Sequence, residues 1–481
     1  MVIQNRFFEP LFFSKTAQLI WWVSFVFFGI VAILNSGIIA LDDYSCIISR
    51  IIPAQNIQYS NLIANSGIRH PLATLLLAFF SKLILGLGIK SPLNQLRVVM
   101  GSIGAFNIFI FSYFGTQFFK GSQISKIKEW TLMFMGFYFL NPLFLTRPMI
   151  ETLSSPFLFL SCFYACRYWM ENKRYNLVLA IMWGTLSSMI RFQTGVCILT
   201  LFICLGIKRD LLGFVITFMA LIIFFCLSGI LEYYISGNFH GSLKAYIHYN
   251  IHYSSGYGTT PFYTFFILMV GLTIPPTFFS RFQRFDWKKN YQPLLPVIAY
   301  VGFFILTHSL VPHKEERFMI PIIPLFLILL VPLFVYLAND KRQSWRLIWF
   351  GFVNVVLLLL TSFNTPQSNV IHLVKYLGDK SQINTVLTVN ESIVLYPTAY
   401  ILKPPQIKTV SVEEIEKLTG LECSVVVAVR EDYNGELKKF PTFHKKIAEF
   451  KPGILEQWLV KLNPEQNRRR GMISLYSDPK C

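Results

Sequence analysis

Residues 211–231 read LLGFVITFMALIIFFCLSGIL, an apolar run without a charged side chain. A helix of about 20 such residues spans the hydrocarbon core of a bilayer, whereas a barrel strand needs only about 9–11. Inside lipid every backbone polar group must be satisfied within the protein, so only helices and closed barrels cross. A run of this length therefore predicts a membrane-spanning α-helix.

The rest of the chain shares this character. Of its 481 residues 54% are hydrophobic and 14% are charged, and the mean hydropathy is +0.50. Soluble domains carry about 25% charged residues, so an ordinary soluble fold is excluded. We expect an all-α polytopic membrane protein with about 11 transmembrane helices. The expected spans are residues 18–41, 97–119, 131–146, 152–170, 177–190, 192–207, 211–235, 262–280, 293–309, 317–338 and 345–362.

The net charge of +18 comes mainly from basic residues in short loops and in the C-terminal tail. This placement indicates membrane orientation rather than nucleic-acid binding. With a cytoplasmic N-terminus, every basic loop cluster falls on one side, provided that residues 71–89 do not cross. We therefore expect residues 66–90 to form a helix that lies in the outer interface.

The composition changes after Ser362 to a mixture of charged and β-branched residues. Residues 385–389 and 423–429 have the composition of strands, and residues 410–418 that of a short helix. These features predict a small extramembrane α/β domain. Five of the eight cysteines lie inside apolar segments, and no disulfide or zinc framework is visible.

Two carboxylates, Asp42 and Asp43, directly follow the first predicted span. One interpretation is a solvated helix end. The other is a general base that accepts the proton of an attacking hydroxyl.

The segment between the spans 293–309 and 317–338 is rich in ionisable groups, which are costly at a membrane boundary unless paired or functional. At helical spacing His313 faces Glu316 and Arg317, and Lys314 faces Arg317, so a salt-bridged turn is one interpretation. The other is a phosphate-binding cluster of Lys314, Arg317 and His313.

Arg147, Glu151 and Arg191 also interrupt apolar sequence on the expected outer side. Each alone can be a snorkelling anchor. Together with residues 313–317 they would build a positive field that favours an anionic lipid headgroup.

The expected outer loop 236–261 is dense in Tyr, His and Asn. Interfacial aromatic belts explain part of this composition. Polar residues such as His248, His252 and Asn250 between aromatic side chains are suited to holding sugar hydroxyls.

The segment His313-Lys-Glu-Glu-Arg-Phe318, followed by the Pro-containing residues 319–325, resembles a His-Lys-Glu-x-Arg-Phe hallmark. This hallmark belongs to the dolichyl-phosphate-mannose-dependent mannosyltransferases of glycosyltransferase family 22. That family builds glycosylphosphatidylinositol (GPI) anchors and lipid-linked N-glycan precursors. Weaker matches to family motifs occur in the expected order at Asp42-Asp43, residues 67–71, Arg147 to Glu151, and Asn250 with Tyr257-Gly258 and Pro261.

The resemblance covers about residues 18–365 and has departures. Residues 47–49 replace a Gln and a Glu of the family, Glu232-Tyr233 replaces its Asp-Ser, and Phe262-Tyr263 replaces its Trp-His. These differences bear on the acceptor more than on the type of reaction.

The resemblance implies a GT-C fold, with a transmembrane catalytic domain at residues 1–365 and a luminal or periplasmic α/β domain at residues 366–481. The large outer loops would be residues 42–96 and 236–261. The host membrane would be that of the endoplasmic reticulum or a bacterial inner membrane.

The implied donor is a polyprenyl-phosphate sugar such as dolichyl-phosphate mannose, and the implied acceptor is a lipid-linked glycan. Asp42 or Asp43 would be the catalytic base of an inverting displacement, and no metal or other cofactor is required. The donor phosphate would be bound by His313, Lys314, Arg317, Arg147 and Arg191. The acceptor or sugar would be bound by Arg69, Glu151, His248, Asn250, Tyr257 and Glu316.

Two other classes of protein remain open at this level. A transporter or flippase of an anionic polyprenyl-linked lipid also needs cations in the membrane but needs no base at an acceptor. A structural subunit of a larger membrane complex would bind no donor. Neither class has nucleic acid as a partner.

Cysteine labelling from the two sides of sealed vesicles tests the expected topology. Because basic loops stay in the cytoplasm, positions 126 and 288 should label from that side, and positions 55, 250 and 436 from the other. Labelling of position 126 from the outside would mean that residues 71–89 cross the membrane.

Overall fold

The computed structural model describes residues 13–40, 44–49, 67–120, 126–253, 256, 258–279, 282, 285–391, 396–417, 422–430, 445–463, 467, 470–478 and 480. The chain forms two compact units. The first comprises Met1–Val31, Gln58–Leu76 and Met100–Leu359. The second comprises Ala32–Ile57, Leu77–Val99 and Leu360–Cys481.

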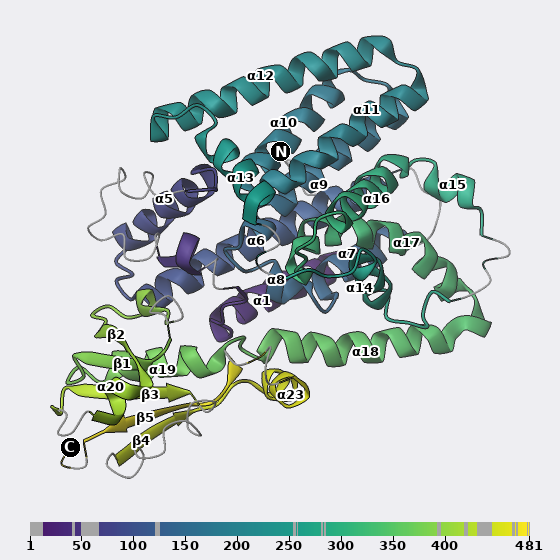
Figure 1. Cartoon of the computed structure of the whole chain (residues 1–481). Helices are drawn as coiled ribbons and strands as arrows, with labels where there is room; N and C mark the ends of the chain where they lie inside the picture. The colour runs from purple at the N-terminus through teal and green to yellow at the C-terminus, as the bar shows by residue number, and fades with distance from the viewer. Residues whose placement is uncertain are drawn as a thin grey trace, which may run out of the picture. The chain divides into compact units, whose positions relative to one another are not determined.

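Helices make up the first unit, and several of them continue into the second (Figure 1). In chain order they are α1 (Lys15–Leu34), α5 (Leu72–Gly86), α6 (Pro92–Phe118), α7 (Ile127–Phe137), α8 (Asn141–Phe144), α9 (Ile150–Glu171), α10 (Tyr175–Ile190), α11 (Val196–Lys208), α12 (Leu211–Ser236), α13 (Gly241–Tyr253), α14 (Thr264–Leu272), α15 (Trp287–Tyr291), α16 (Leu295–Ser309), α17 (Ile323–Asn339) and α18 (Ser344–Phe363).

Every predicted apolar span contains helix. Within the described residues, five helical stretches are long and apolar enough to cross a membrane: Lys15–Leu34, Pro92–Phe118, Leu211–Ser236, Glu316–Asn339 and Lys341–Asp379. Four shorter apolar helices accompany them, Leu72–Gly86, Tyr175–Ile190, Phe192–Lys208 and Leu295–Ser309.

Two predicted spans are broken by proline. The span 262–280 is α-helical only over α14, because Pro275 and Pro276 follow and lack the N–H that would continue the helix. The span 131–146 is divided into α7 and α8 ahead of Pro142. Asn141 Nδ2 donates hydrogen bonds of 3.1 and 2.9 Å to the carbonyls of Phe134 and Met135 in the last turn of α7.

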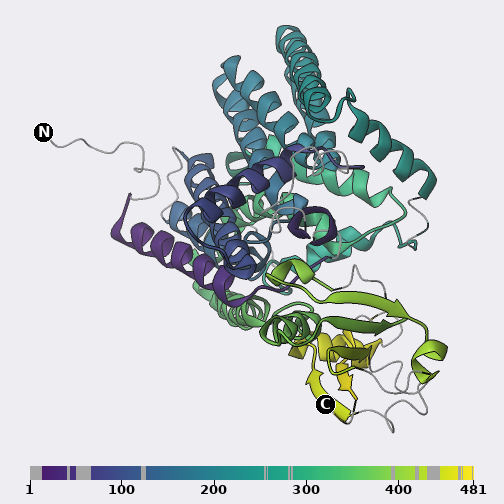
Figure 2. The same cartoon turned by 90° about the vertical axis from the view of Figure 1, so that its left-hand side faces the viewer.

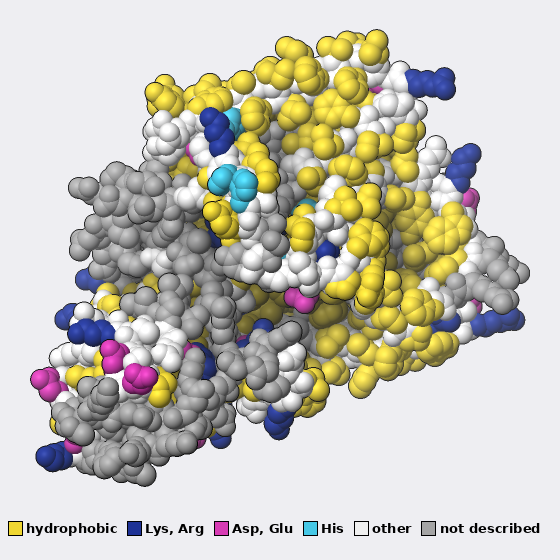
Figure 3. All heavy atoms as spheres, in the orientation of Figure 1, with side chains coloured by type: hydrophobic (Ala, Val, Ile, Leu, Met, Phe, Trp, Pro, Cys, Tyr) yellow, Lys and Arg dark blue, Asp and Glu magenta, His cyan; other side chains and the backbone are white. Residues whose placement is uncertain are grey.

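The helix α12 shows how membrane helices pack here. Its buried residues are mostly small or polar (Gly213, Thr217, Ala220, Ser228, Gly229 and Glu232), whereas large apolar side chains such as Leu212 and Ile223 are exposed. Figure 3 shows hydrophobic side chains covering this part of the surface. Small residues let helix backbones approach closely in lipid, where burying apolar side chains gives no advantage.

The second unit contains a five-stranded sheet in the order β2-β1-β3-β5-β4 (Figure 2). The strands are β1 (Thr385–Val389), β2 (Gln406–Val410), β3 (Val425–Arg430), β4 (Lys445–Phe450) and β5 (Ile473–Ser477). β1 pairs in parallel with β2 and β3, and β5 runs antiparallel to β3 and β4. The helices of this sheet region are α19 (Ser368–Asp379), α20 (Val412–Lys417) and α23 (Ile454–Leu462).

The predicted α/β domain is thus confirmed. The two predicted strands are the central β1 and β3, whose apolar side chains form the core together with Ile415 of α20. No disulfide framework is visible in the sequence, but the structure has a disulfide at Cys423. Five cysteines of the apolar segments, Cys162, Cys166, Cys197, Cys204 and Cys226, are free.

Candidate active site

The acidic pair Asp42-Asp43 and Tyr257 lie outside the described residues. The residues on both sides of the acidic pair are held firmly within the second unit. Asn35 Nδ2 donates a 2.9 Å hydrogen bond to the carbonyl of Ser362 at the end of α18. Beyond the pair, Tyr44 Oη accepts a 2.9 Å hydrogen bond from the amide of Ala399.

In the first unit, Glu151 and Arg191 form a deeply buried ion pair. Glu151 lies in the first turn of α9, and Arg191 directly follows the last residue of α10. Arg191 Nη1 donates to Glu151 Oε1, and the two side chains are 4% and 1% exposed. The helices pack closely here because Ser187 of α10 donates a 2.9 Å hydrogen bond to the carbonyl of Ser154 of α9. Removing one partner of a buried ion pair leaves the other charge buried and unpaired, which strongly destabilises the fold. Glu151 and Arg191 therefore each need the other for the fold to be stable.

The hallmark segment forms a second charged group. Arg317 donates to both carboxylate oxygens of Glu315, at 2.6 Å from Nε and 3.3 Å from Nη2. His313 Nε2 lies 3.0 Å from Glu315 Oε1. Burial alone would raise the pKa of Glu315, but hydrogen bonds and charge from Arg317 and His313 outweigh it and lower that pKa. The carboxylate is therefore ionised at neutral pH.

The pairing predicted for this segment at helical spacing is wrong. Glu315 has an extended backbone (φ −124°, ψ 143°), and the 3-10 helix Glu316–Ile322 begins only after it. Because the helix begins only after it, the Glu315 side chain is free of the helical spacing and contacts both His313 and Arg317. Glu316 is exposed on the following turn.

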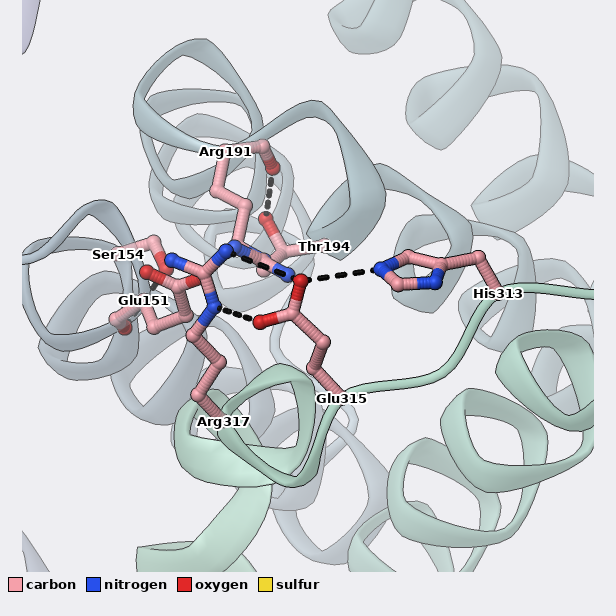
Figure 4. A network of polar contacts seen from close by, with 7 residues as sticks. All are labelled: Glu151, Ser154, Arg191, Thr194, His313, Glu315 and Arg317. Atoms are coloured by element: carbon pink, nitrogen blue, oxygen red, sulfur yellow. Dashed lines mark hydrogen bonds and ion pairs between the residues drawn. The ribbon is translucent and has the colours of Figure 1, made fainter. Parts of the chain in front are cut away.

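Figure 4 shows Glu151 and Arg191 beside Arg317, Glu315 and His313. The ring of Phe318 contacts the arginines of both charged groups. The guanidinium carbon of Arg191 lies 5.0 Å from the ring centroid and that of Arg317 lies 5.7 Å from it. The His313 ring centroid is 6.0 Å away, edge to face. Cations within about 6 Å of an aromatic face are attracted by its quadrupole. Two arginines from distant parts of the sequence thus share one ring.

Lys314 points to a different set of partners. Its Nζ donates hydrogen bonds of 3.0 Å to the carbonyl of Thr260 and 2.6 Å to that of Val311. The amide of Thr260 in turn donates a 3.1 Å bond to the carbonyl of Pro312. Lys314 therefore links Thr260, within the Tyr257-to-Pro261 motif, to the hallmark segment. Its ammonium group donates hydrogen bonds to backbone carbonyls.

The other expected site residues are more scattered. Arg147 is buried in the turn before α9, where its Nη1 donates to Met100 Sδ at 3.4 Å. Arg69 is half-buried beside His70. His248 is exposed on α13, and Asn250 donates a 2.8 Å bond to the carbonyl of Tyr246 one turn earlier.

The region expected to be a loop, residues 236–261, is largely the helix α13. Glu232 holds its start, since Oε1 accepts a 2.6 Å hydrogen bond from the amide of Ser242. Tyr246 packs against Phe192 with ring centroids 5.3 Å apart. Burial raises the pKa of Tyr246, against the charge of Arg191 and hydrogen bonds to Gln193 and Asn250. These contacts bring α13 to the residues next to Arg191.

Glu315, Phe318, Tyr246 and His308 belong to this site but were not singled out from the sequence. Glu315 and Phe318 lie in the hallmark, so the motif itself was the signal. His308 is buried, and its Nδ1 lies 2.8 Å from the carbonyl of Phe304. The aromatic content of the expected loop was the only signal for Tyr246.

Unpaired polar atoms remain next to the ion pair. Nε and Nη2 of Arg191, Oε2 of Glu151 and Nε2 of His308 are buried without a hydrogen-bond partner among the described residues. Buried polar groups are nearly always paired in native proteins, with protein, water or ligand. Two guanidinium N–H groups without partners are the arrangement expected where an anionic group binds.

Two curated relatives match parts of the chain. GPI mannosyltransferase 3 of Candida albicans is 24% identical over 291 residues, which are 59% of this chain and 55% of that protein. GPI mannosyltransferase 3 of Saccharomyces cerevisiae is 31% identical over 150 residues, which are 28% of this chain and 24% of that protein. The chain thus spans about half the length of the first relative and about a quarter of the second.

Solved structures of ArnT from Cupriavidus metallidurans share the fold. The form bound to undecaprenyl phosphate has a TM-score of 0.58 at 11% identity, covering 96% of this chain and 98% of that one. The apo form has a TM-score of 0.61 at 11% identity, covering 95% and 97%. The expected GT-C fold is confirmed. Residues 58–401 match the model of the Alg9-like mannosyltransferase family, and this chain belongs to that family.

Proposed function

We propose that this protein is an inverting mannosyltransferase. It moves mannose from a polyprenyl-phosphate donor, such as dolichyl-phosphate mannose, to a lipid-linked glycan such as a GPI-anchor or N-glycan precursor. The observation that carries the proposal is that two arginines, Arg191 and Arg317, share the ring of Phe318 within the family-matched region. The names of the two yeast relatives support the mannosyl group and the GPI acceptor.

The donor phosphate binds to the group formed by His313, Arg317 and Arg191. Glu315 holds Nε and Nη2 of Arg317 and so fixes the plane of its guanidinium before the donor arrives. The phosphate gains negative charge as its bond to the sugar breaks, and cations fixed in advance in a site with little water stabilise that change most. Arg147 adds positive charge from the turn before α9.

Asp42 activates the acceptor hydroxyl. Asp43 orients either Asp42 or the acceptor. Asp42 takes the hydroxyl proton as the oxygen attacks the anomeric carbon, and the electrons of the old C–O bond leave on the phosphate oxygen. A single displacement inverts the anomeric centre. Glu151, Arg69, His248, Asn250, Tyr257 and Glu316 are the remaining candidates for contacts with the sugar and the acceptor.

The proposed location is the endoplasmic reticulum membrane, with the reaction on the luminal side. The two relatives come from yeasts, which supports a eukaryotic membrane. The disulfide at Cys423 supports an oxidising compartment for the C-terminal sheet region, since disulfides persist there and are rare in the cytosol.

Arg317 and Lys314 provide a matched pair for testing the donor site. Arg317→Ala should lower kcat/KM for the donor by roughly 10–100-fold, since a hydrogen bond to a charged group contributes about 1.5–3 kcal/mol. Lys314→Met should mainly lower the melting temperature of the purified protein, because it frees the Thr260 and Val311 carbonyls. Donor titrations and thermal melts of both variants measure this. If the activity of Arg317→Ala fell only as far as its folded yield, a purely structural salt-bridged turn would replace this account.

Variants of the buried ion pair Glu151–Arg191 distinguish its contribution to folding from its contribution to mannosyl transfer. Glu151→Leu alone should reduce folded yield sharply, because an unpaired buried arginine costs about 3–5 kcal/mol. The double variant Glu151→Leu/Arg191→Met should recover yield but not mannosyl transfer. Size-exclusion yield and transfer rate per folded molecule are the readouts, and wild-type transfer by the double variant would remove Arg191 from the mechanism.

The acidic pair decides between an enzyme and a lipid flippase. Asp42→Asn keeps the shape of the side chain but removes the proton acceptor, so single-turnover transfer should fall roughly 10²–10⁴-fold with donor binding nearly unchanged. Asp43→Asn should cost less. Near-wild-type transfer by both variants would show that neither carboxylate is the base, and the flippase alternative would gain support.

A further inference from the structure

The helix α23 (Ile454–Leu462) exposes large apolar side chains and buries a polar one, the reverse of a helix in a soluble domain. Glu456 is the only one of its residues that is buried. The Glu456 carboxylate accepts a 2.9 Å hydrogen bond from the amide of Gln367 and lies 3.5 Å from Arg470 Nε. Burial raises the pKa of this carboxyl group. The helix therefore attaches to its unit through a polar residue and leaves its apolar side outward.

The outward side is a continuous apolar stripe. Ile454, Trp458 and Leu462 follow one another at intervals of four residues, so they lie on one face of the helix. Their exposed fractions are 64%, 64% and 82%, and Leu459 beside them is 42% exposed. Single exposed apolar residues are ordinary, but an aligned set on one short helix indicates a binding surface.

Contacts within the second unit fix α23 beside the end of α18. A Cβ added to Gly453, the residue before α23, would lie 2.3 Å from Asn364 Oδ1, directly after α18. Ser368 Oγ also donates a 3.2 Å bond to the carbonyl of Lys451. The helix α18 belongs to a stretch with the length and composition of a membrane span, and its last residue, Phe363, is 45% exposed.

A polar cavity of about 620 Å³ opens at the same junction. Its lining includes Asn364, His372, Lys451 and Gln457, together with the aromatic rings of Phe363 and Phe450. Polar groups at this junction suit the headgroup level of a membrane, and Trp458 of the stripe has the amphipathic ring that is enriched there.

We propose that α23 lies in the interface of the protein's own membrane, at the end where α18 leaves it. The stripe Ile454-Trp458-Leu462 is buried at the boundary between headgroups and acyl chains, and Lys461 at the edge of the stripe extends to the phosphates. The occupant is a phospholipid surface rather than a second protein, because the contacts of Gly453 and Lys451 hold α23 beside the end of α18, which belongs to a stretch with the length and composition of a membrane span. This inference does not depend on the proposed reaction.

Photocrosslinking of the full-length protein in phosphatidylcholine nanodiscs tests the proposal. Benzoylphenylalanine replaces Trp458 or Leu462, and the matched control is the exposed Glu413 on α20. Mass spectrometry should find lipid adducts at positions 458 and 462 and few at position 413. Equal lipid adducts at all three positions, or protein–protein adducts at position 458, would overturn the assignment.

Hydrogen exchange is a second test, which remains informative if one of the crosslinking variants fails to fold. In the triple variant Ile454→Ser/Trp458→Ser/Leu462→Ser, hydrogen exchange of the α23 amides in nanodiscs should speed up several-fold, because the helix loses its attachment to lipid. Exchange in α20 should stay as in the wild type. Unchanged protection of α23 in the triple variant would contradict a lipid-bound stripe.

Discussion

The absence of water in the bilayer interior governs this structure. Polar groups there must find partners inside the protein, and burying apolar side chains gives no advantage over leaving them in lipid. α12 shows the second consequence, with Gly213, Thr217 and Ala220 packed inward and leucines outward. The pair Glu151–Arg191 shows that polar groups find partners inside the protein. These two charged side chains, 1% and 4% exposed, pair with each other where α9 and α10 meet.

The same constraint shapes the candidate site. The cations of the hallmark segment are not a free positive cluster, since each described arginine of the Phe318 group has a carboxylate partner. Pairing holds the guanidinium groups in place before a ligand arrives, which is what electrostatic stabilisation of a leaving group needs. It also lowers the net attraction for anions. In the proposed function the donor phosphate would use Nε and Nη2 of Arg191, which have no hydrogen-bond partner among the described residues.

The parts of the fold that depend on composition and on the length and pattern of apolar runs could be predicted from the sequence. Apolar length located the spans, and the β-branched run at residues 385–389 located β1 with its observed ends. Features that depend on the backbone path could not be predicted. The extended conformation of Glu315 decides which residues pair, and the partners of Lys314 are carbonyl groups that leave no signal in the sequence. α13 was taken for a loop because GSLKAYIHYNIHY is polar and aromatic without a clear apolar face.

Sugar transfer from a lipid phosphate can be measured with purified protein, polyprenyl-phosphate mannose and a panel of lipid-linked acceptors. We expect at least one acceptor to gain a single mannose with inverted anomeric configuration, and free polyprenyl phosphate to accumulate in equal amount. A protein that binds the donor and moves it across vesicle membranes, but transfers mannose to no acceptor, would contradict the account.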